Sequence, residues 1–554
     1  MPFVAAIAVV AALVGGTFLG RRSAHTEPPE FRQLTFARGY VHSVRFAPDG
    51  QTVIYGAAVE GRPLALFSTR VDSSESRPFD LPSADVAGVS RDGQMALLLG
   101  RHHYGSWLRV GTLAQVSLAG GTPREILEDV FDADISPDGK QFAVVVVDGD
   151  DQVLQYPIGK ELFRTRGWIG QPRIASDGKR VAFVDHRVWG DDLGEIKLAG
   201  ADGKVVRLSP ELQYSHGVSW SPDGNEVWFT AANDIGGCAL WRVAPGDAPR
   251  SVLTTPTAMR IQDIAADGHI LLVTDEGRAT LAGQLAGDTS ERTYSWWDND
   301  SASAISVDGT IYAGDNASVV VDGEYSVFFR RGDTPPVQLG TGVAAGITPD
   351  GKFVFSTNLT GNRSTLSVRP VGPGQTRSID LGGLATEPGA PQRRVTCSSD
   401  GRRVAFIATK PGAGRAVWVM DLDGGAPHAA SPDGAYSAII SPDGSKVVVG
   451  DMNRGMYVVP AAGGNAVPVA GAPKIDIPVA WSSDGREILS WDRTLPPRIY
   501  RTALEGGRRE LVRELIPADP AGILYGWLTM SSDGRFYLQR YRRVLSSVYL
   551  TTLR

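Results

Sequence analysis

Short apolar runs recur along the whole chain, and each is interrupted by a tight-turn signal. The segments VRFAPDGQTVIYGA from Val44, VSWSPDGNEVWFT from Val218 and AIISPDGSKVVVG from Ala438 share one plan: an apolar run, Pro-Asp-Gly and a second apolar run. Short runs rich in β-branched and aromatic residues, bounded by Gly, Pro and Asp, are typical of β-strands. The pattern therefore predicts pairs of strands joined by turns.

The Asp-Gly dipeptide marks a repeat that covers the chain from residue 31 to its end. Its aspartates are Asp49, Asp92, Asp138, Asp177, Asp223, Asp267, Asp308, Asp350, Asp400, Asp443, Asp484 and Asp533. Asp can hydrogen-bond the backbone two residues on, and Gly accepts a positive φ without steric penalty. We therefore predict that these aspartates are turn residues and not catalytic groups.

A second turn signal follows many of these pairs, as at Asp423-Gly424-Gly425 and Ala462-Gly463-Gly464, with an apolar run on either side. Four strands per repeat make one blade of a β-propeller. Twelve repeats are too many for one ordinary ring, so the sequence predicts an all-β fold of about twelve four-stranded blades in two six-bladed propellers. The expected domains are 31–290 and 291–554. The end strands FRQLTFA and SSVYLTTLR are expected to complete one blade together and so tie the halves to each other.

The Ser-Pro-Asp-Gly turns with the later Asp-Gly-Gly turns resemble the WD40-like (PD40) repeats of TolB-type propellers. The opening FRQLTFARGYVHSVRFAPDGQTVIYG, from Phe31, more closely resembles the extracytoplasmic propeller that follows the transmembrane helix in bacterial membrane serine/threonine protein kinases. The resemblance spans residues 31 to 554 and is specific for the fold. It implies a sensor or binding role outside the cytoplasm.

The N-terminus differs from the repeats. Pro2 to Gly20 carry no charge and are followed at once by Arg21 and Arg22. This length is at the lower edge for a membrane-spanning helix. We expect a single-pass anchor at 1–22 and a polar linker at 23–30, which places the protein in the cell membrane. The basic flank alone favours a cytoplasmic location for the repeats, whereas the family resemblance favours an extracytoplasmic (periplasmic) one.

Charge and cysteine content exclude two classes of function. The formal net charge is -6 and no block of five or more Lys or Arg occurs, so no nucleic-acid partner is expected. The two cysteines, Cys238 and Cys397, lie far apart in strand-like sequence. They lack metal-site spacing and are expected to be small buried side chains.

Catalytic signatures are missing from the repeats. The sequence has no Gly-rich loop with a strand lysine, no His-Arg-Asp loop, no Asp-Phe-Gly and no Gly-x-Ser-x-Gly. We therefore expect no catalytic residues and no kinase activity from the residues printed.

One polar constellation is expected at the mouth of the first propeller's axial channel, where residues that precede the inner strands converge. Positions four to seven residues before the turn aspartates carry His42, Asp85, Asp132, Gln171, His216 and Asp263. Imidazoles and carboxylates can hold a divalent cation or a cationic group, although such side chains also simply face channel water. The second half offers Arg393, Tyr436 and Trp527 instead, so the two rings are expected to recognise different things.

These observations favour a membrane-anchored recognition module without a cofactor, which binds a protein, peptide or glycan. Two alternatives stay open. In the first, the chain is the sensor half of a receptor serine/threonine kinase whose catalytic domain is not in the printed sequence. In the second, it is an enzyme that uses the His/Asp cluster at the mouth of the first propeller.

Overall fold

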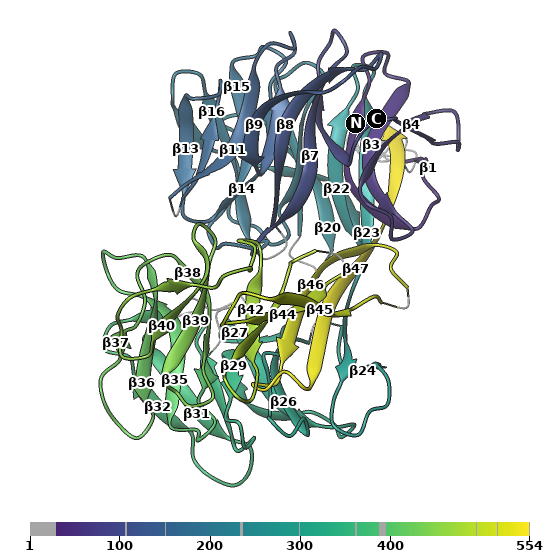
Figure 1. The fold of residues 1–554 in the computed structure, drawn as a ribbon. Coiled ribbons are helices and arrows are strands. Elements are labelled where there is room, and N and C mark those ends of the chain that lie inside the picture. Colours follow the sequence, from purple (N-terminus) through teal and green to yellow (C-terminus); the bar gives the residue numbers. More distant parts are fainter. Residues whose placement is uncertain are drawn as a thin grey trace, which may run out of the picture.

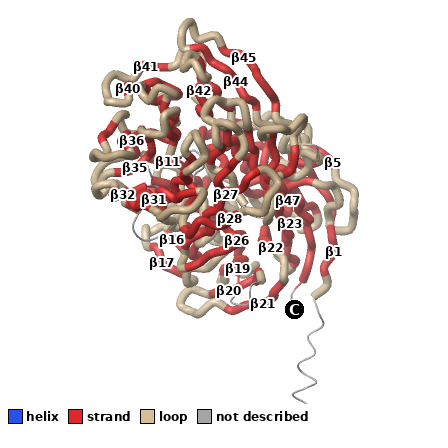
Figure 2. Tube along the Cα trace, turned by 90° about the horizontal axis from the view of Figure 1, so that it is seen from below, coloured by secondary structure: helices blue, strands red, loops and turns tan. Residues whose placement is uncertain are grey.

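Antiparallel sheets follow one another along the chain in the computed structural model. It describes residues 29–552 apart from 106–107, 150, 233–236, 299, 360–362, 387–394, 495 and 518. Figure 2 shows strands and loops in these residues and no helix. The predicted anchor and most of the linker lie outside them. Among the described residues, no helix is long and apolar enough to cross a membrane.

The first group of strands forms five four-stranded sheets, each in sequence order. Its strands are β2 (Gly39–Phe46), β3 (Thr52–Val59), β4 (Ala65–Arg70), β5 (Arg77–Pro78); β6 (Ala84–Val89), β7 (Gln94–Gly105), β8 (Leu108–Ser117), β9 (Arg124–Val130); β10 (Asp132–Ile135), β11 (Phe142–Asp148), β12 (Asp151–Gln155), β13 (Glu161–Thr165); β14 (Trp168–Ile174), β15 (Arg180–His186), β16 (Gly194–Gly200), β17 (Val205–Arg207); β18 (His216–Trp220), β19 (Val227–Ala232), β20 (Cys238–Val243) and β21 (Arg250–Thr255).

The second group forms five further sheets, of which the third has five strands. Its strands are β25 (Ala304–Ile305), β26 (Ile311–Val321), β27 (Glu324–Arg331), β28 (Val337–Thr341); β29 (Val343–Ile347), β30 (Phe353–Thr357), β31 (Thr365–Pro370), β32 (Arg377–Asp380); β33 (Ala385–Thr386), β34 (Thr396–Cys397), β35 (Arg403–Thr409), β36 (Arg415–Asp421), β37 (His428–Ala429); β38 (Ala435–Ile440), β39 (Lys446–Asp451), β40 (Gly455–Pro460), β41 (Val467–Pro468); β42 (Ile477–Trp481), β43 (Glu487–Trp491), β44 (Arg498–Ala503) and β45 (Arg509–Glu514).

A six-stranded sheet joins the two groups. It contains β1 (Phe31–Gln33), β22 (Ala258–Ile264), β23 (His269–Gln284), β24 (Arg292–Thr293), β46 (Ile523–Met530) and β47 (Tyr537–Thr552). Strands β23 and β47 pair over all sixteen residues of each, from His269 opposite Thr552 to Gln284 opposite Tyr537. At about 3.3 Å per residue this ladder is about 50 Å long.

Each end of this long ladder completes a different set of sheets. At one end β22 pairs with β23 and β1 pairs with β47, with Phe31 opposite Thr551. At the other end β46 pairs with β47 and β24 pairs with β23. The predicted pairing of the two chain ends is thus confirmed, and Figure 1 shows the N and C termini side by side.

The innermost strands contact one another in two closed cycles. One runs β2, β6, β10, β14, β18, β22 and back to β2, and the other runs β25, β29, β34, β38, β42, β46 and back to β25. We call these cycles, with the sheets that radiate from them, the first ring and the second ring; Figure 1 shows the first above the second. The all-β class and the propeller fold predicted from the repeat are what the chain adopts. The domain boundary at 290/291 stays a prediction.

The Asp-Gly signals are turns, as predicted. Ser441 Oγ donates a hydrogen bond of 2.6 Å to Asp443 Oδ1, and the same carboxylate oxygen accepts from the Ser445 amide at 3.0 Å. Gly444 follows with a φ of +70°, a conformation that glycine adopts without strain. Equivalent Ser–Asp bonds occur at Asp138, Asp223 and Asp484. Adjacent sheets pack through apolar faces, as where Val184 and Leu198 meet Trp220 and Phe229.

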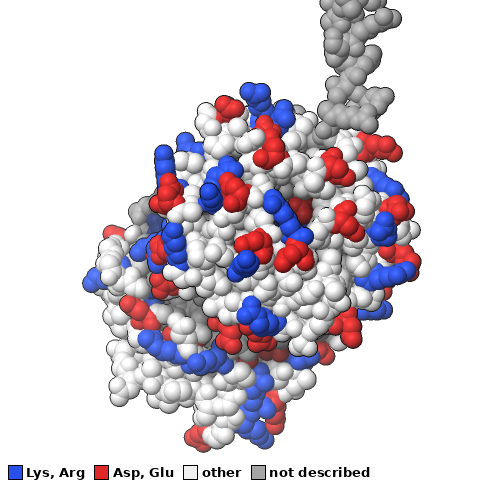
Figure 3. Space-filling view, turned by 90° about the horizontal axis from the view of Figure 1, so that it is seen from above, with Lys and Arg blue, Asp and Glu red and all other residues white. Residues whose placement is uncertain are grey.

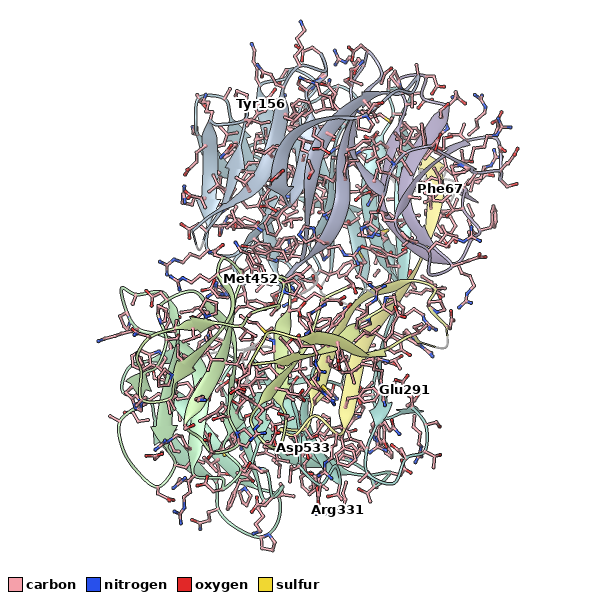
Figure 4. The ribbon with its side chains drawn as sticks, viewed as in Figure 1. Phe67, Tyr156, Glu291, Arg331, Met452 and Asp533 are labelled. Atoms are coloured by element: carbon pink, nitrogen blue, oxygen red, sulfur yellow. The ribbon has the colours of Figure 1, made fainter. Side chains whose placement is uncertain are left out.

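Direct contacts also join the rings away from the shared sheet. Arg493 of the second ring donates to the carbonyl of Tyr104 of the first at 3.2 Å, and to Met452 Sδ at 3.2 Å. Figure 4 shows Met452 at the edge of the second ring that faces the first. Asp519, which precedes β46, pairs with Arg38 at 2.7 Å. The two rings are therefore held together by side-chain contacts as well as by β23 and β47.

Because β23 and β47 belong to both rings, we predict that the rings unfold in one transition. Leu271 on β23 lies in the first ring's core and Leu538 on β47 lies in the second's, both fully buried. Leu271→Ala and Leu538→Ala should each lower the free energy of unfolding by about 2–5 kcal/mol. Differential scanning calorimetry should show a single heat-absorption peak shifted by either change.

The exposed Leu511 on the outermost strand β45 provides a matched control; Leu511→Ala should leave the peak where it is. Two peaks, each shifted by only one of the core substitutions, would show that the rings unfold separately and would contradict the prediction.

Candidate functional site

A cavity of about 400 Å³, lined by charged, polar and aromatic side chains, lies on the axis of the first ring. Side chains from several sheets converge on it, because the start of each inner strand approaches the axis. Leu524, Arg542 and Val544 also line it, although they come from β46 and β47 at the junction with the second ring. The cavity is therefore built by both rings.

Five of the six residues proposed from the sequence lie in the cavity wall: His42, Asp85, Asp132, Gln171 and His216. Asp263 does not. It lies behind the wall, where its carboxylate accepts from the Phe46 amide at 3.0 Å and pairs with Arg173 at 3.1 Å. The residue seven positions before the turn aspartate Asp267 is Arg260, and Arg260 lines the cavity.

Irregular pairing of the inner strands with their neighbours turns these side chains toward the axis. The register between β2 and β3 shifts at His42, and that between β22 and β23 shifts at Gln262. A β-bulge inserts an extra residue and re-aims the side chains beside it. In β14 the shift spans Gln171, whose φ is +49°. The backbone amide of Gln171 donates to the Asp132 carboxylate at 2.9 Å, and its side-chain oxygen accepts from the backbone amide of Gly217 at 2.6 Å.

Sequence reasoning missed the arginines of the wall. Arg101 and Arg109 come from the long hairpin of β7 and β8, Arg260 from β22 and Arg542 from β47, and all four line the cavity. Arg260 could have been predicted from the sequence, since it occupies the position that His42 and His216 occupy in their repeats. The others lie on strands that follow the inner strand or come from the far end of the chain, so no repeat position marks them.

Most charges of the wall are held in pairs. Arg260 grips Asp275 through Nε at 2.6 Å and a second nitrogen at 3.1 Å. Arg101 pairs with Asp85 at 2.8 Å, and His216 Nε2 lies 2.9 Å from Asp192. The two-point contact of Arg260 orients both of its groups, and all three pairs keep buried charges compensated.

Burial shifts the protonation of the remaining groups. It lowers the pKa of Arg109 to about 10, with the nearby Arg101 charge acting in the same direction. It raises the pKa of Asp132, which has two backbone amides as partners, from Gln171 and Ala133, at 2.9 Å each. At neutral pH Arg109 thus remains a cation, because its pKa stays well above 7.

Aromatic rings form the less polar part of the wall. Tyr40 stands edge-on to His42 with ring centroids 4.6 Å apart, and Tyr214 stands edge-on to His216 at 4.8 Å. Trp168 lines the cavity and stacks on His186 behind it, with centroids 3.5 Å apart and 3° between the planes. His186 is fully buried, and burial lowers its pKa to about 3.

The second ring offers a different interior. Its axial cavity is only about 80 Å³ and is lined mainly by apolar side chains, among them Ile305, Ile439 and Trp527. Tyr436 is buried in a neighbouring apolar cluster, and Arg393 lies outside the described residues. Charged side chains line the first cavity, and none among the described residues line the second. That the two rings recognise different ligands stays a prediction.

Among the described residues, no three His, Cys, Asp or Glu side chains lie close enough together to hold a metal ion. Both cysteines are buried and unbridged. The divalent cation considered from the sequence stays an untested prediction.

No protein-family model and no curated protein sequence matches the chain. Among solved structures the chain is similar to the tricorn protease, with 14% identity and a TM-score of 0.32 over 90% of this chain and 56% of that one. The chain spans little more than half of that protein's length. A similarity of this size carries no argument about function or site.

His186 makes an acid-sensitive contribution to stability. The folded protein keeps this imidazole neutral, with a pKa of about 3, whereas its ordinary value in an unfolded chain is about 6.5. The contribution is therefore fully present above about pH 6.5 and is lost as the pH falls toward about 3, by up to about 5 kcal/mol.

We predict that His186→Phe, which keeps a flat ring against Trp168, loses this pH dependence. Urea unfolding at stepwise lower pH should show the free energy of the parent falling faster than that of the variant below about pH 6.5. Parallel curves for the two proteins would show that His186 is not the group responsible.

Proposed function

We propose that this chain is a recognition protein of two six-bladed, TolB-like propellers that binds its ligand in the axial cavity of the first ring. The observation that carries the proposal is the cavity itself: about 400 Å³, with charged and aromatic side chains from sheets far apart in the sequence. Ligand sites are typically concave, partly apolar and equipped with a few convergent polar groups. The repeated turns and the two cycles of inner strands support the blade number.

The cost of burying charge supports a binding role for this cavity. Replacing a buried ion pair by well-packed apolar residues is often neutral or stabilising. A wall with five arginines and four aspartates is therefore not explained by stability alone. A rigid frame that keeps such groups oriented in advance lowers the cost of ligand binding.

Among its described residues, the outer face of the first ring shows no large patch of one sign of charge (Figure 3). Figure 3 looks onto the side that points away from the second ring and shows Lys and Arg interspersed with Asp and Glu. Large single-sign fields steer charged partners, whereas a mixed surface does so weakly. The cavity is accordingly the better candidate for specific recognition.

The proposed ligand is a peptide, a glycan or an exposed segment of a protein. The apolar segment Pro2 to Gly20 supports attachment to the cell membrane, and the resemblance to kinase-linked propellers supports an extracytoplasmic location. In such an arrangement the cavity would bind ligands that lie outside the cytoplasm, close to the membrane.

A bulky side chain in the cavity should abolish binding. Ala258 lines the cavity at the start of β22, whereas Ala119 lies exposed in the turn after β8. We predict that the purified full-length protein binds features on peptide or glycan arrays, and that Ala258→Trp reduces these signals by about tenfold or more. Ala119→Trp, which adds the same group elsewhere on the first ring, should leave them unchanged.

Signals that survive Ala258→Trp in a folded protein would place recognition outside the cavity. If the parent protein bound no feature of either array, the peptide or glycan assignment would fall.

A further inference from the structure

Arg109 lies in the wall of the first-ring cavity and has no carboxylate partner in the described part of the chain. Of the arginines in its wall, Arg260 pairs with Asp275 and Arg101 with Asp85. Arg45 lies among backbone carbonyls, at 2.9 Å from that of Ala87 and 2.8 Å from that of Val44. Of the described groups, Arg109 has one backbone carbonyl and one imidazole beside it and no carboxylate, so its surroundings bear directly on what the cavity accepts.

Within the residues that the structure describes, Arg109 forms no direct ion pair with a carboxylate. One nitrogen lies 3.4 Å from His42 Nε2, and another donates to the carbonyl of Leu524. Its Nε is buried and has no hydrogen-bond partner. In the described part of the chain, no Asp or Glu oxygen lies within ion-pair distance of this guanidinium.

Neighbouring carboxylates cannot supply the missing charge without giving up their own partners. Asp85 accepts from Arg101 at 2.8 Å and from the Ser43 hydroxyl. Asp132 is held by two backbone amides. A buried cation without an anion is unfavourable unless a ligand or solvent compensates it.

We infer that the ligand of the first-ring cavity carries a carboxylate group that pairs with Arg109. The inference rests on the proposed function, since it names the chemistry of the group that the same cavity binds. A planar guanidinium with free donors matches a carboxylate at two points. The sequence had suggested a cationic guest for this site; the arginines of β7 and β8 favour an anionic one.

The single charge of Arg109 favours a singly charged group. A carboxylate places one negative charge opposite the Arg109 guanidinium, whereas a phosphate at neutral pH carries more. Beside Arg109 the wall includes Leu108, Phe131 and Leu524, which suit a body with apolar faces. The peptide C-terminus and the uronic acid unit of a glycan both provide a carboxylate on such a body.

Paired probes that differ only in the charged group test the inference. Isothermal titration calorimetry on the full-length protein would compare N-acetylphenylalanine with its amide, and galacturonate with galactose. We expect the acid of one pair to bind about tenfold or more tightly than its neutral partner. The pair that shows this preference identifies the source, peptide or glycan.

Substitution of Arg109 should remove the preference. Arg109→Gln should equalise the acid and its neutral partner, and Arg109→Lys, which keeps the charge but not the fork, should retain part of the difference. Arg278→Gln is the matched control, because Arg278 is exposed on β23 and does not line the cavity. Thermal unfolding checks that each variant is folded. If Arg109→Gln is not folded, the comparison of Arg109→Lys with the parent protein tests the inference.

The outcomes separate this inference from the proposed function. Equal binding of acid and neutral probe, no binding of either acid, or a preference that survives Arg109→Gln would overturn the carboxylate inference. The proposed function would still stand if the array ligands remained sensitive to Ala258→Trp. If that sensitivity were absent as well, both would fall.

Discussion

The pairing of β23 with β47 is the interaction on which the rest of the structure depends. These strands are separated by about 250 residues of chain, yet they pair along their full lengths from one ring into the other. Each ring thereby obtains two strands of its last sheet from this ladder. A propeller must close to remove its exposed strand edges. Here the same pair of strands closes both rings.

The cavity is a consequence of this shared closure. β47 carries Arg542 and Val544 into the wall of the first ring, while β46 brings Leu524, whose carbonyl accepts from Arg109. The ends of the second ring thus set the position of a cation in the first. Together with the shifted register at His42 and Gln262, they hold polar groups in orientations that isolated sheets would not maintain.

The repeat made most of the fold predictable from sequence, because turn chemistry and strand patterning act locally. It also placed His42, Asp85 and His216, which occupy the same position relative to their turns. Asp263 was misplaced because it stands closer to its turn than they do, and the equivalent residue is Arg260. Arg109 and Arg542 could not be found this way, since their place in the wall depends on hairpin length and on which distant strand pairs with β23.

The difference between the rings was partly visible in the sequence and has a physical basis in side-chain size and polarity. Trp527 fills space on the second axis, where the first ring keeps charged groups around an open volume. The role of the N-terminal apolar segment was inferred from composition alone, because residues 1–28 lie outside the described structure.

Hydrogen exchange of the β23 and β47 amides, followed by mass spectrometry of their peptides, tests the shared ladder most directly. If the rings close through one continuous ladder, residues 269–284 and 537–552 should exchange together and only through global opening, with equal protection in both halves of each strand. Fast exchange at residues 276–278 and 543–545, between independently protected halves, would show two separate rings and contradict the account.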